Sequence, residues 1–419
     1  MIRQAVFLVG GKGTRLGELT RDVPKPLLEI SPGVRFLDVL LEEAARHGFS
    51  DIVLLAGHLG ESVQQIYDGR VMRNAKVRVI REPAPMGTGG ALRYAAESLD
   101  PAFVMANGDS LFEFNLRALA TPLKEGVSAR IALREVPDPS RYGAVQLEGD
   151  RVVGFVEKSS DLKGPMLING GVYAMSINVL DLIDGPCSIE TDVFPRLAAE
   201  GRLEGRRFDG YFLDIGLPNT LARARAEIPE RHRFGCAFLD RDGVLNHDNG
   251  YTHRPEDLTW TLGAIRAVRR LNDAGLLVIV VTNQAGIGKG RYGEADMRAF
   301  HEAMNRELAE PGAHIDDFYF CPYHENATVD CYRVANHEDR KPNPGMLLRA
   351  VKDWRIDVGR SFMIGDKDTD MESAARAGVA GHLYKGGDLD DFVSALLSAN
   401  DSPVTAGRAG ARGGASRNS

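Results

Sequence analysis

The segment VGGKGTRLGELTRDVPKPLLEI (9–30) continues the apolar run AVFLV (5–9) and decides how the first half of the chain folds. An apolar run that enters a glycine loop predicts a buried strand whose end can approach an anion, because glycine lets backbone N–H groups come close. The loop is not a P-loop, since Lys12 precedes Gly13, and Leu16 stands where a dinucleotide fingerprint needs glycine. We therefore expect a phosphate-binding loop of another kind.

Short continuous apolar runs recur along the chain, and each is followed by glycine or aspartate and then by a helical pattern. Such runs are typical of strands buried on both faces, as in a parallel sheet covered by helices. They are AVFLV (5–9), IVLLA (52–56), FVMAN (103–107), CAFLD (236–240), LVIVV (277–281) and SFMIGD (361–366). Between them, FLDVLLEEAARHG (36–48) has the spacing of an amphipathic helix that ends at Gly48. The predicted fold class is α/β throughout.

Length and one charged segment divide the chain into domains. A chain of 419 residues is long for a single core. The segment ARARAEIPERHRF (222–234) is charged, contains Pro229 and precedes a new apolar run. We therefore expect one domain over 1–230 and a second over 231–398. Because the end of the chain lacks large apolar groups, we expect a disordered tail over 399–419.

The composition disfavours several classes of protein. The net charge of −7 disfavours a nucleic-acid surface, which needs clustered lysine and arginine. The longest apolar runs are too short to cross a bilayer, and the run at 5–9 is broken too early for a signal peptide. Four cysteines are too few for a disulfide framework in this chain. We expect a cytoplasmic protein that acts on small molecules, without nucleic-acid or membrane partners. The oligomeric state stays open.

Further motifs follow the glycine loop in order. They are PMGTGGALR (85–93), NGDS (107–110), RYGAVQLEG (141–149), VEK (156–158), NGGVY (169–173) and FLDIGLP (212–218). Together with the glycine loop, they resemble the sugar-phosphate nucleotidyltransferases over about residues 1–225. The resemblance implies a Rossmann-like doubly wound fold and attack of a sugar 1-phosphate on the α-phosphorus of a nucleoside triphosphate. No enzyme nucleophile is needed, so positioning and charge neutralisation provide the catalysis.

The same resemblance assigns roles to individual residues. Arg15 and Lys25 would act on the phosphates, and Asp109 and Asp214 would bind Mg²⁺, whose preference for hard oxygen ligands suits carboxylates and phosphates. The residues expected at the nucleotide are Gly10, Gly11, Gly13, Thr14, Gly87 and Thr88. Those expected at the sugar phosphate are Gly143, Glu157, Lys158 and Asn169.

The second half begins with FLDRDGVLNHD (238–248), a predicted buried strand that ends in Asp-x-Asp-Gly. The next motifs along the chain are VVTNQAG with Thr282, RKP with Lys341, and GDKDTD with Asp366 and Asp370. They resemble the haloacid dehalogenase (HAD) superfamily over about residues 232–395. The resemblance implies a second doubly wound, HAD-like fold with phosphatase activity.

This second resemblance divides the chemistry among the motif residues. Asp240 would attack phosphorus and carry the phosphoryl group, while Asp242 would protonate the leaving alcohol and then activate water. Mg²⁺ would be bound by Asp240, Asp366 and the main-chain carbonyl of Asp242, and the role of Asp370 stays open. The other residues expected at the substrate are Thr282 and Lys341 on the phosphoryl oxygens, with Asn283 and Arg340 beside them.

The motif sequences of the second half most resemble those of the heptose 1,7-bisphosphate 7-phosphatases, although histidinol-phosphate phosphatases share many of these residues. A phosphatase that releases a sugar 1-phosphate would supply the substrate of the first half. Histidinol phosphate is therefore disfavoured, because its product is not a substrate for a nucleotidyltransferase. The first half resembles the heptose 1-phosphate guanylyltransferases, so we expect a bifunctional enzyme that makes GDP-heptose from GTP and the α-anomer. Two alternatives stay open. Both activities could use another sugar, or a non-catalytic nucleotide-sensing domain could regulate the phosphatase.

The segment CPYHENATVDCYRVANHEDRKP (321–342) looks like a zinc site. Zinc-bearing relatives have Cys-x-His and, after a gap, Cys-x-Cys directly before Arg-Lys-Pro. Here Tyr323 occupies the histidine position, while His337 and Asp339 occupy the cysteine positions, and tyrosine is a poor ligand for structural zinc. We expect a zinc-free substrate loop. A rearranged zinc site stays open, formed by Cys321, His324, Cys331 and His337.

Overall fold

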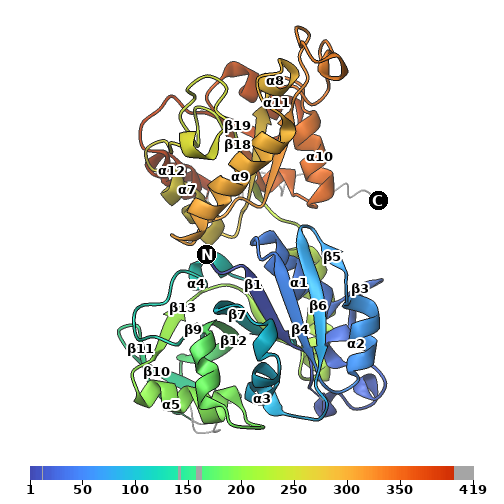
Figure 1. Ribbon diagram of the computed structural model, residues 1–419, viewed down its shortest axis with the longest axis vertical. Helices are drawn as coiled ribbons and strands as arrows, with labels where there is room; N and C mark the ends of the chain where they lie inside the picture. The colour runs from blue at the N-terminus through green and yellow to red at the C-terminus, as the bar shows by residue number, and fades with distance from the viewer. Residues whose placement is uncertain (12, 140–142, 157–162, 401–419) are drawn as a thin grey trace, which may run out of the picture.

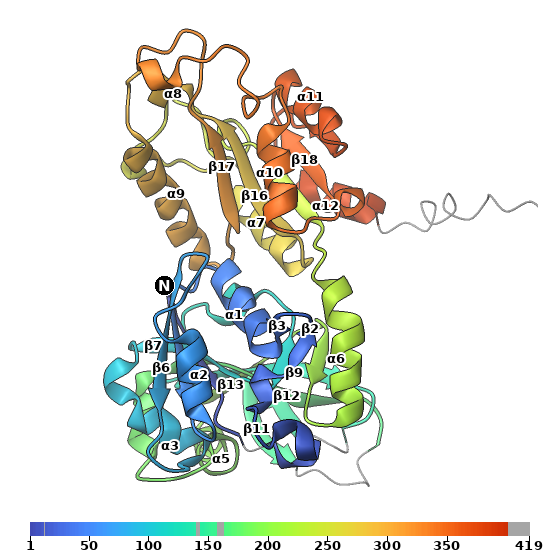
Figure 2. The same cartoon turned by 90° about the vertical axis from the view of Figure 1, so that its right-hand side faces the viewer.

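The computed structural model describes residues 1–11, 13–139, 143–156 and 163–400, and shows two α/β domains stacked along the long axis of the molecule (Figures 1 and 2). The α/β class predicted from the apolar runs is confirmed in both domains. Among the described residues, no helix combines the length and apolar character needed to cross a membrane.

The ends of the predicted domains can be compared with the observed elements. Helix α6 (Pro218–Arg231) ends the first domain and strand β15 (Cys236–Leu239) begins the second, close to the boundary predicted at residue 231. Helix α12 (Leu389–Asn400) extends two residues into the predicted tail, because Leu396 and Leu397 continue its apolar face onto the core. The rest of that tail lies outside the described residues.

The described part of the first domain forms a ten-stranded sheet. The strands, in spatial order, are β10 (Ala144–Glu148), β11 (Arg151–Val156), β13 (Leu203–Arg207), β9 (Ala129–Val136), β12 (Met166–Ser176), β7 (Ala102–Asn107), β1 (Gln4–Leu8), β4 (Asp51–Ala56), β6 (Ala75–Arg81) and β5 (Val71–Met72). Strands β7, β1, β4 and β6 run parallel, whereas β12 runs antiparallel to β7 and β9. The loops that follow the four parallel strands therefore leave the sheet at one edge.

Helices cover both faces of this sheet. They are α1 (Phe36–Arg46), α2 (Gly60–Tyr67), α3 (Gly87–Tyr94), α4 (Leu116–Leu119), α5 (Phe194–Ala199) and α6. Phe7 and Leu54 pack into a core with α1, α2 and α6, while Val6 and Leu55 pack into another with α3 and α5. Because successive strand residues face opposite layers, both must be apolar, which explains the continuous runs. Gly48, two residues beyond α1, has φ +77°, the left-handed conformation expected of a helix stop.

The described part of the second domain forms a five-stranded parallel sheet with helices on both faces. The strands, in spatial order, are β17 (Asp317–Cys321), β16 (Leu277–Asn283), β15, β18 (Phe362–Gly365) and β19 (Ala380–Leu383). The helices are α7 (Ala264–Asp273), α8 (Ala285–Gly288), α9 (Glu294–Ala309), α10 (Gly345–Asp353), α11 (Asp368–Arg376) and α12. Leu239 faces the core that includes α7, α9 and α12, and Phe238 faces the core that includes α10. The second doubly wound fold is thus also formed.

The two domains meet at the amino ends of their parallel strands. Arg117 donates to the carbonyls of Ile2 and His47, just before β1 and β4, at 2.5 Å each. The His47 ring lies 4.5 Å from the ring of His314, which precedes β17. The carboxyl edges of both sheets therefore face away from the interface. Figure 1 shows α3 at one end of the molecule and α8 at the other.

A buried ion pair crosses the interface. Arg46, at the end of α1, donates to Asp316 at 3.3 Å and to Glu43 of its own helix at 2.7 Å. Asp316 is fully buried, and its other oxygen accepts from the backbone N–H of Val278 at 2.8 Å. Burial alone would raise the pKa of Asp316, but His314 and Arg46 lower it below its usual value, so the carboxylate stays charged inside the interface.

Replacing Asp316 by alanine should lower the free energy of unfolding by about 3–5 kcal/mol, because Arg46 loses its cross-domain partner while remaining buried. A matched control is Glu200, which forms an exposed pair with Arg202 at 2.7 Å. Glu200→Ala should cost less than about 1 kcal/mol. Urea unfolding followed by circular dichroism measures both. Equal losses for the two variants would show that the interface does not depend on this pair.

Candidate functional site

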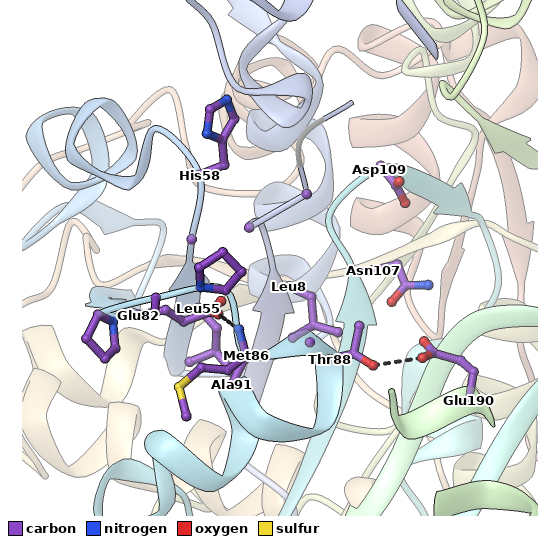
Figure 3. Close-up of a pocket in the computed structure, with 17 residues that line it drawn as sticks. Leu8, Leu55, His58, Glu82, Met86, Thr88, Ala91, Asn107, Asp109 and Glu190 are labelled. Atoms are coloured by element: carbon purple, nitrogen blue, oxygen red, sulfur yellow. Dashed lines mark hydrogen bonds between the residues drawn. The ribbon is translucent and has the colours of Figure 1, made fainter. Parts of the chain in front are cut away.

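The loops after β1, β4, β6 and β7 enclose a cavity of about 570 Å³ in the first domain (Figure 3). Figure 3 shows Glu82 and Met86 on one side of it and Asn107 and Asp109 on the other. The predicted residues that line it are Gly10, Gly11, Gly87, Thr88 and Asp109. Gly10 must be small, since a Cβ there would lie 2.9 Å from the backbone nitrogen of Gly57. The structure thus brings both predicted glycine loops to one cavity.

A buried lysine joins the two aspartates predicted to bind metal in this domain. Lys25, 6% exposed, donates to Asp109 at 2.7 Å and lies 3.7 Å from an Asp214 oxygen. Strands β8 (Ser110–Phe112) and β14 (Phe212–Asp214) pair antiparallel and place the Ser110 hydroxyl 3.2 Å from Asp109 and 3.4 Å from Asp214. Two motifs far apart in the sequence therefore form one charged cluster at the edge of the cavity.

The second loop is anchored to the segment from Cys187 to Glu190. The Thr88 hydroxyl donates to Glu190 at 2.8 Å and accepts from the backbone N–H of Ile189 at 2.8 Å. Gly87 has φ +71°, and a Cβ at this position would collide with the Cys187 carbonyl. Only glycine fits here, so the loop backbone stays against the cavity.

The 3-10 helix Thr14–Thr20 follows the glycine loop, and its first residues do not line the cavity. Gly13 has φ +61°, and its carbonyl accepts from the Thr20 hydroxyl at 2.9 Å, which closes the turn. Thr14 and Arg15 are exposed, and Arg15 has no ion-pair partner among the described residues. The structure therefore leaves Arg15 available to an incoming charged ligand.

The residues predicted at the sugar phosphate are only partly described. Asn169 accepts from the Gly171 N–H at 2.9 Å and donates to the Tyr173 hydroxyl at 3.0 Å, which fixes its amide in β12. Gly143 has φ +77° directly before β10. Glu157 and Lys158 lie outside the described residues, so their predicted contacts remain predictions.

Glu82, directly after β6, is a candidate that the sequence did not single out. One carboxylate oxygen accepts from the Met86 N–H at 3.2 Å, and the other lies against the backbone of Gly10 and Gly57. Burial raises the pKa of Glu82, and the Met86 N–H offsets this only in part. The cavity therefore contains a carboxylate with unused hydrogen-bond acceptors. In the sequence, Glu82 could be recognised as an acidic residue that directly precedes the second glycine loop, PAPMGTGG.

In the second domain, a buried lysine again joins two aspartates. Lys341, 4% exposed, lies 2.7 Å from Asp240 at the end of β15 and 2.7 Å from Asp370 in the first turn of α11. It also donates to the Val281 carbonyl at 2.9 Å. Burial alone would lower the pKa of Lys341, but Asp240 and Asp370 raise it, so the ammonium stays charged.

A third carboxylate completes this cluster. Oxygens of Asp240, Asp366 and Asp370 lie within 4.8 Å of one another. One oxygen of Asp366 is buried without a hydrogen-bond partner in the described part of the chain. Burial, followed by the charges of Asp240 and Asp370, raises the pKa of Asp366 to about 6. Gly243, with φ +96°, allows the close approach, since a Cβ there would lie 2.5 Å from Asp366. An orphaned oxygen among crowded carboxylates fits a divalent cation.

The carboxylate of Asp242 is held by a different set of side chains. Arg241, fully buried, donates through one nitrogen to both oxygens, at 2.9 and 2.8 Å. Asn246 and Gln284 each add a hydrogen bond of 3.0 Å. The Gln284 amide also donates to the Thr282 hydroxyl at 2.8 Å. The structure thus fixes Asp242 and Thr282 through one shared neighbour, next to the three-carboxylate cluster.

The remaining predicted residues of this domain are Asn283, at the end of β16, and Arg340, on the loop that carries Lys341. Asn283 and Lys341 exchange two hydrogen bonds of 3.1 Å, which tie the loop to the end of β16. Arg340 donates to the Tyr323 carbonyl at 3.2 Å. Its guanidinium group is therefore fixed to the loop that resembles a zinc site.

The rearranged set of zinc ligands does not form. Cys321 is buried at the end of β17, where burial raises the pKa of its thiol to about 11, whereas Cys331 is exposed. The rings of Tyr323 and His337 stack at 3.8 Å, and His324 accepts from a backbone N–H nearby. Within the described ranges, the group of three or more side chains placed to hold a metal ion is the aspartate cluster, which includes none of the four residues of the rearranged set. A stacked aromatic pair therefore occupies the place of a ligand pair.

Several contacts were missed because they join residues inside quoted motifs to each other. Arg241 and Asn246 stand in FLDRDGVLNHD and Gln284 stands in VVTNQAG, where the sequence predicts roles for the acids, Thr282 and Asn283 but not for these three residues. The available signal was a run of polar residues directly after a buried strand, where parallel sheets hold their sites.

Two protein families match this chain. The nucleotidyl transferase family matches residues 4–231, and the HAD-hydrolase-like family matches residues 339–401. The D-glycero-beta-D-manno-heptose-1,7-bisphosphate 7-phosphatase of Rhodopseudomonas palustris is 48% identical over 162 residues, or 39% of this chain and 89% of that protein. The D-glycero-alpha-D-manno-heptose-1,7-bisphosphate 7-phosphatase of Burkholderia mallei is 44% identical over 142 residues, or 34% and 75%. The structure of HddC from Yersinia pseudotuberculosis is 30% identical and covers 54% of this chain and 100% of its own, with a TM-score of 0.47.

The raised pKa of Asp366 predicts how stability changes with pH. Because the native state holds this proton more tightly than the unfolded chain, its stabilising effect is complete below about pH 4 and is lost as pH rises through about 6. In EDTA, Asp366→Asn should therefore be more stable than the wild type at pH 7, and the difference should vanish near pH 4. Thermal unfolding measures this.

Magnesium ions should raise the wild-type melting temperature above pH 6, because a bound cation relieves the repulsion among the carboxylates. Asp366→Asn should lose this increase, while Asp368→Asn, an exposed neighbour, should keep it. An equal Mg²⁺ effect in Asp366→Asn and wild type would contradict a metal site at Asp366.

Proposed function

We propose that this chain, which belongs to the nucleotidyl transferase family and carries a HAD-like phosphatase domain, converts a heptose 1,7-bisphosphate to a nucleoside diphosphate heptose. The second domain would remove the 7-phosphate. The first domain would transfer a nucleotidyl group to the remaining 1-phosphate and release pyrophosphate. The observation that carries the proposal is that each domain holds a lysine-bridged pair of aspartates at the carboxyl edge of its sheet, where α/β folds bind ligands.

In the phosphatase step, a carboxylate oxygen of Asp240 attacks phosphorus, and the bond from phosphorus to the sugar oxygen breaks. Asp242, in its protonated form, gives its proton to that oxygen. It then takes a proton from water, whose oxygen attacks the phosphoryl-aspartate and releases phosphate. Lys341 lies 2.7 Å from Asp240 and is placed to balance the charge of the phosphoryl oxygens. Thr282 is held beside Asp242 through Gln284 and is placed to donate to the same oxygens.

In the transfer step, an oxygen of the sugar 1-phosphate attacks the α-phosphorus of the nucleotide, and the bond to pyrophosphate breaks. The chain supplies no nucleophile, so its contribution is position and charge. Lys25 lies between Asp109 and Asp214 and is placed to neutralise charge on the reacting phosphates. The glycine loops allow the backbone to approach the triphosphate, and the exposed Arg15 is free to contact its far end.

Both sites suit Mg²⁺, which when bound supplies neutralisation of the phosphate oxygens. Asp109 and Asp214 offer two carboxylates, a number typical of Mg²⁺ sites that substrate phosphates and water complete. In the second domain, Asp240 and Asp366 offer oxygens on the face of the cluster where one Asp366 oxygen has no hydrogen-bond partner among the described residues. Asp370 is engaged by Lys341 and by the Lys367 N–H, which suits a role in holding the lysine.

The choice of heptose rests on the names of the phosphatase relatives and on the coupling of the two reactions. A sugar bisphosphatase that spares the anomeric phosphate yields the acceptor that a nucleotidyltransferase needs. Histidinol has no phosphate to offer, so histidinol phosphate does not fit the first domain. One relative is named for the β-anomer and the other for the α-anomer. The α-anomer is proposed from the resemblance of the first half to guanylyltransferases.

Guanine fits the cavity of the first domain because of Glu82. Of the common bases, only guanine presents two adjacent donors, its ring N–H and amino group, on one edge. An ionised carboxylate is an acceptor and can bind both. Uracil places carbonyl oxygens on both sides of its single N–H, and these would repel Glu82. A guanine edge would also supply the donors that this partly buried carboxylate lacks.

The function is tested by supplying a heptose 1,7-bisphosphate with each nucleoside triphosphate in turn. Phosphate, pyrophosphate and the sugar nucleotide are then measured. We expect phosphate in every reaction, and pyrophosphate with the sugar nucleotide most rapidly with GTP. Phosphate without pyrophosphate under any nucleotide would contradict the transferase assignment. A hexose bisphosphate used faster than heptose would contradict the sugar.

Asp240→Asn separates the two activities. The variant should release no phosphate from the bisphosphate, because the amide is a poor nucleophile toward phosphorus. It should still form the sugar nucleotide when supplied with the sugar 1-phosphate, because Asp240 and Lys25 lie in different domains. Loss of both activities in a folded variant would show that the sites are not independent.

Glu82→Gln should change the choice of base. Hydrogen bonds to a charged group contribute about 1.5–3 kcal/mol, so kcat/KM for GTP should fall about 10- to 100-fold. The wild type should prefer GTP to ITP, which lacks the amino group, and the variant should lose most of that preference. Thr191→Ala is a control near the cavity, and because its side chain is exposed it should leave the ratio of kcat/KM for GTP to that for ITP unchanged. An unchanged GTP-to-ITP ratio in Glu82→Gln would exclude Glu82 as the residue that reads the base.

A further inference from the structure

A cavity of about 790 Å³ lies between the two domains. The first domain contributes the segment 206–211, which begins at the end of β13, together with residues 113–115. The second domain contributes the end of α7 and Arg360. In the described part of the chain, this interdomain cavity shares no residue with the cavity of the first domain or with the aspartate cluster of the second.

Seven arginines and five acids line the interdomain cavity. Three arginines are neutralised by N–O contacts of 2.7 Å, in the pairs Arg46–Glu43, Arg231–Glu113 and Arg269–Asp273. The other four are Arg206, Arg207, Arg233 and Arg360, and none has a carboxylate within ion-pair distance in the described ranges. Only Asp209 and Glu230 remain to balance them, and Asp209 already pairs with Arg134 at 3.3 Å. The cavity therefore has an excess of positive charge.

The excess positive charge includes a half-buried side chain, that of Arg206. Its side chain is half-buried and donates to the Ala118 carbonyl at 2.7 Å, which leaves its charge unbalanced. Burial, together with the neighbouring guanidinium groups of Arg269 and Arg130, lowers its pKa. Asp273 and Asp150 offset this effect only in part, and a bound anion would offset it further.

A buried amide lies beside the interdomain cavity. Asn272, 4% exposed, accepts from the His314 backbone N–H at 2.9 Å through its side-chain oxygen. Its side-chain nitrogen is buried and has no hydrogen-bond partner among the described residues. Because this nitrogen has almost no accessible surface, it lies behind the wall of the cavity and would not contact a ligand there.

We propose that the interdomain cavity binds a diphosphate group, carried by inorganic pyrophosphate or by a nucleoside diphosphate. Four unpaired arginines need more than one negative charge, and arginine binds phosphate oxygens through two parallel hydrogen bonds. The volume is within the range of small-molecule sites. Because the walls come from both domains, the ligand would join them.

Hydrogen–deuterium exchange tests the proposal on the full chain, because it reports each site separately. Pyrophosphate, GDP, phosphate and sodium chloride are compared at equal ionic strength. We expect pyrophosphate to slow exchange in peptides that cover 203–211 and 231–235, with phosphate and chloride ineffective. GDP acting at lower concentration than pyrophosphate would identify a nucleotide as the ligand, and the reverse order would identify free pyrophosphate.

Arg207→Ser/Arg233→Ser removes two exposed arginines of the cavity. It should weaken the protection of these peptides at least about tenfold, while peptides over the glycine loop respond as in the wild type. Arg306→Ser/Lys352→Ser makes the same change of charge elsewhere on the second domain and should keep the protection. No protection by pyrophosphate, or equal protection in the cavity variant, would overturn the proposal. Both results are independent of whether the chain transfers nucleotides.

Discussion

Each domain depends on one buried lysine that holds two aspartates at the carboxyl edge of its sheet. Asp109 and Asp240 follow strands of the parallel sheets, whereas Asp214 ends β14, which pairs antiparallel with β8, and Asp370 lies in the first turn of α11. In each pair the carboxylates come close and repel one another. Lys25 offsets the repulsion between Asp109 and Asp214, and Lys341 does so for Asp240 and Asp370. Without Lys341, the nearly buried carboxylates of Asp240 and Asp370 would lie together at a cost of about 3–5 kcal/mol, whereas Asp109 is partly exposed and water screens the first pair. The two folds differ in strand order, yet both arrive at the same arrangement of charge.

Features that depend on local pattern and on motif order could be predicted from the sequence. Continuous apolar runs predicted the buried strands, because both faces of each sheet are covered. Asp109 and Asp240 stand at the ends of such runs, and their predicted roles rest on the ordered motifs and on the family resemblance. The lysines were found only through family resemblance, since their partners lie on other strands. Glu82 was missed for the same reason, because its place in the cavity depends on Gly10 and Gly57.

The zinc-like loop shows a different limit of sequence reasoning. Cysteine and histidine spacing suggested possible ligands, but spacing does not determine which side chains face each other. Stacking of Tyr323 on His337 uses the histidine as an aromatic surface, and burial keeps the Cys321 thiol protonated. The interdomain cavity could not be foreseen either, because its arginines come from segments that meet only after both domains fold.

The orientation of the two sheets has a kinetic consequence. Their amino edges meet around Arg46 and Asp316, so each reaction takes place at an opposite end of the molecule. The sugar 1-phosphate released at one end must diffuse through the solvent before the first domain of this or another molecule can bind it. Product formation should then begin with a lag while this pool fills, and unrelated enzymes can draw on the same pool. The covalent link provides the two domains in a fixed one-to-one ratio, but it does not channel the sugar 1-phosphate from one site to the other.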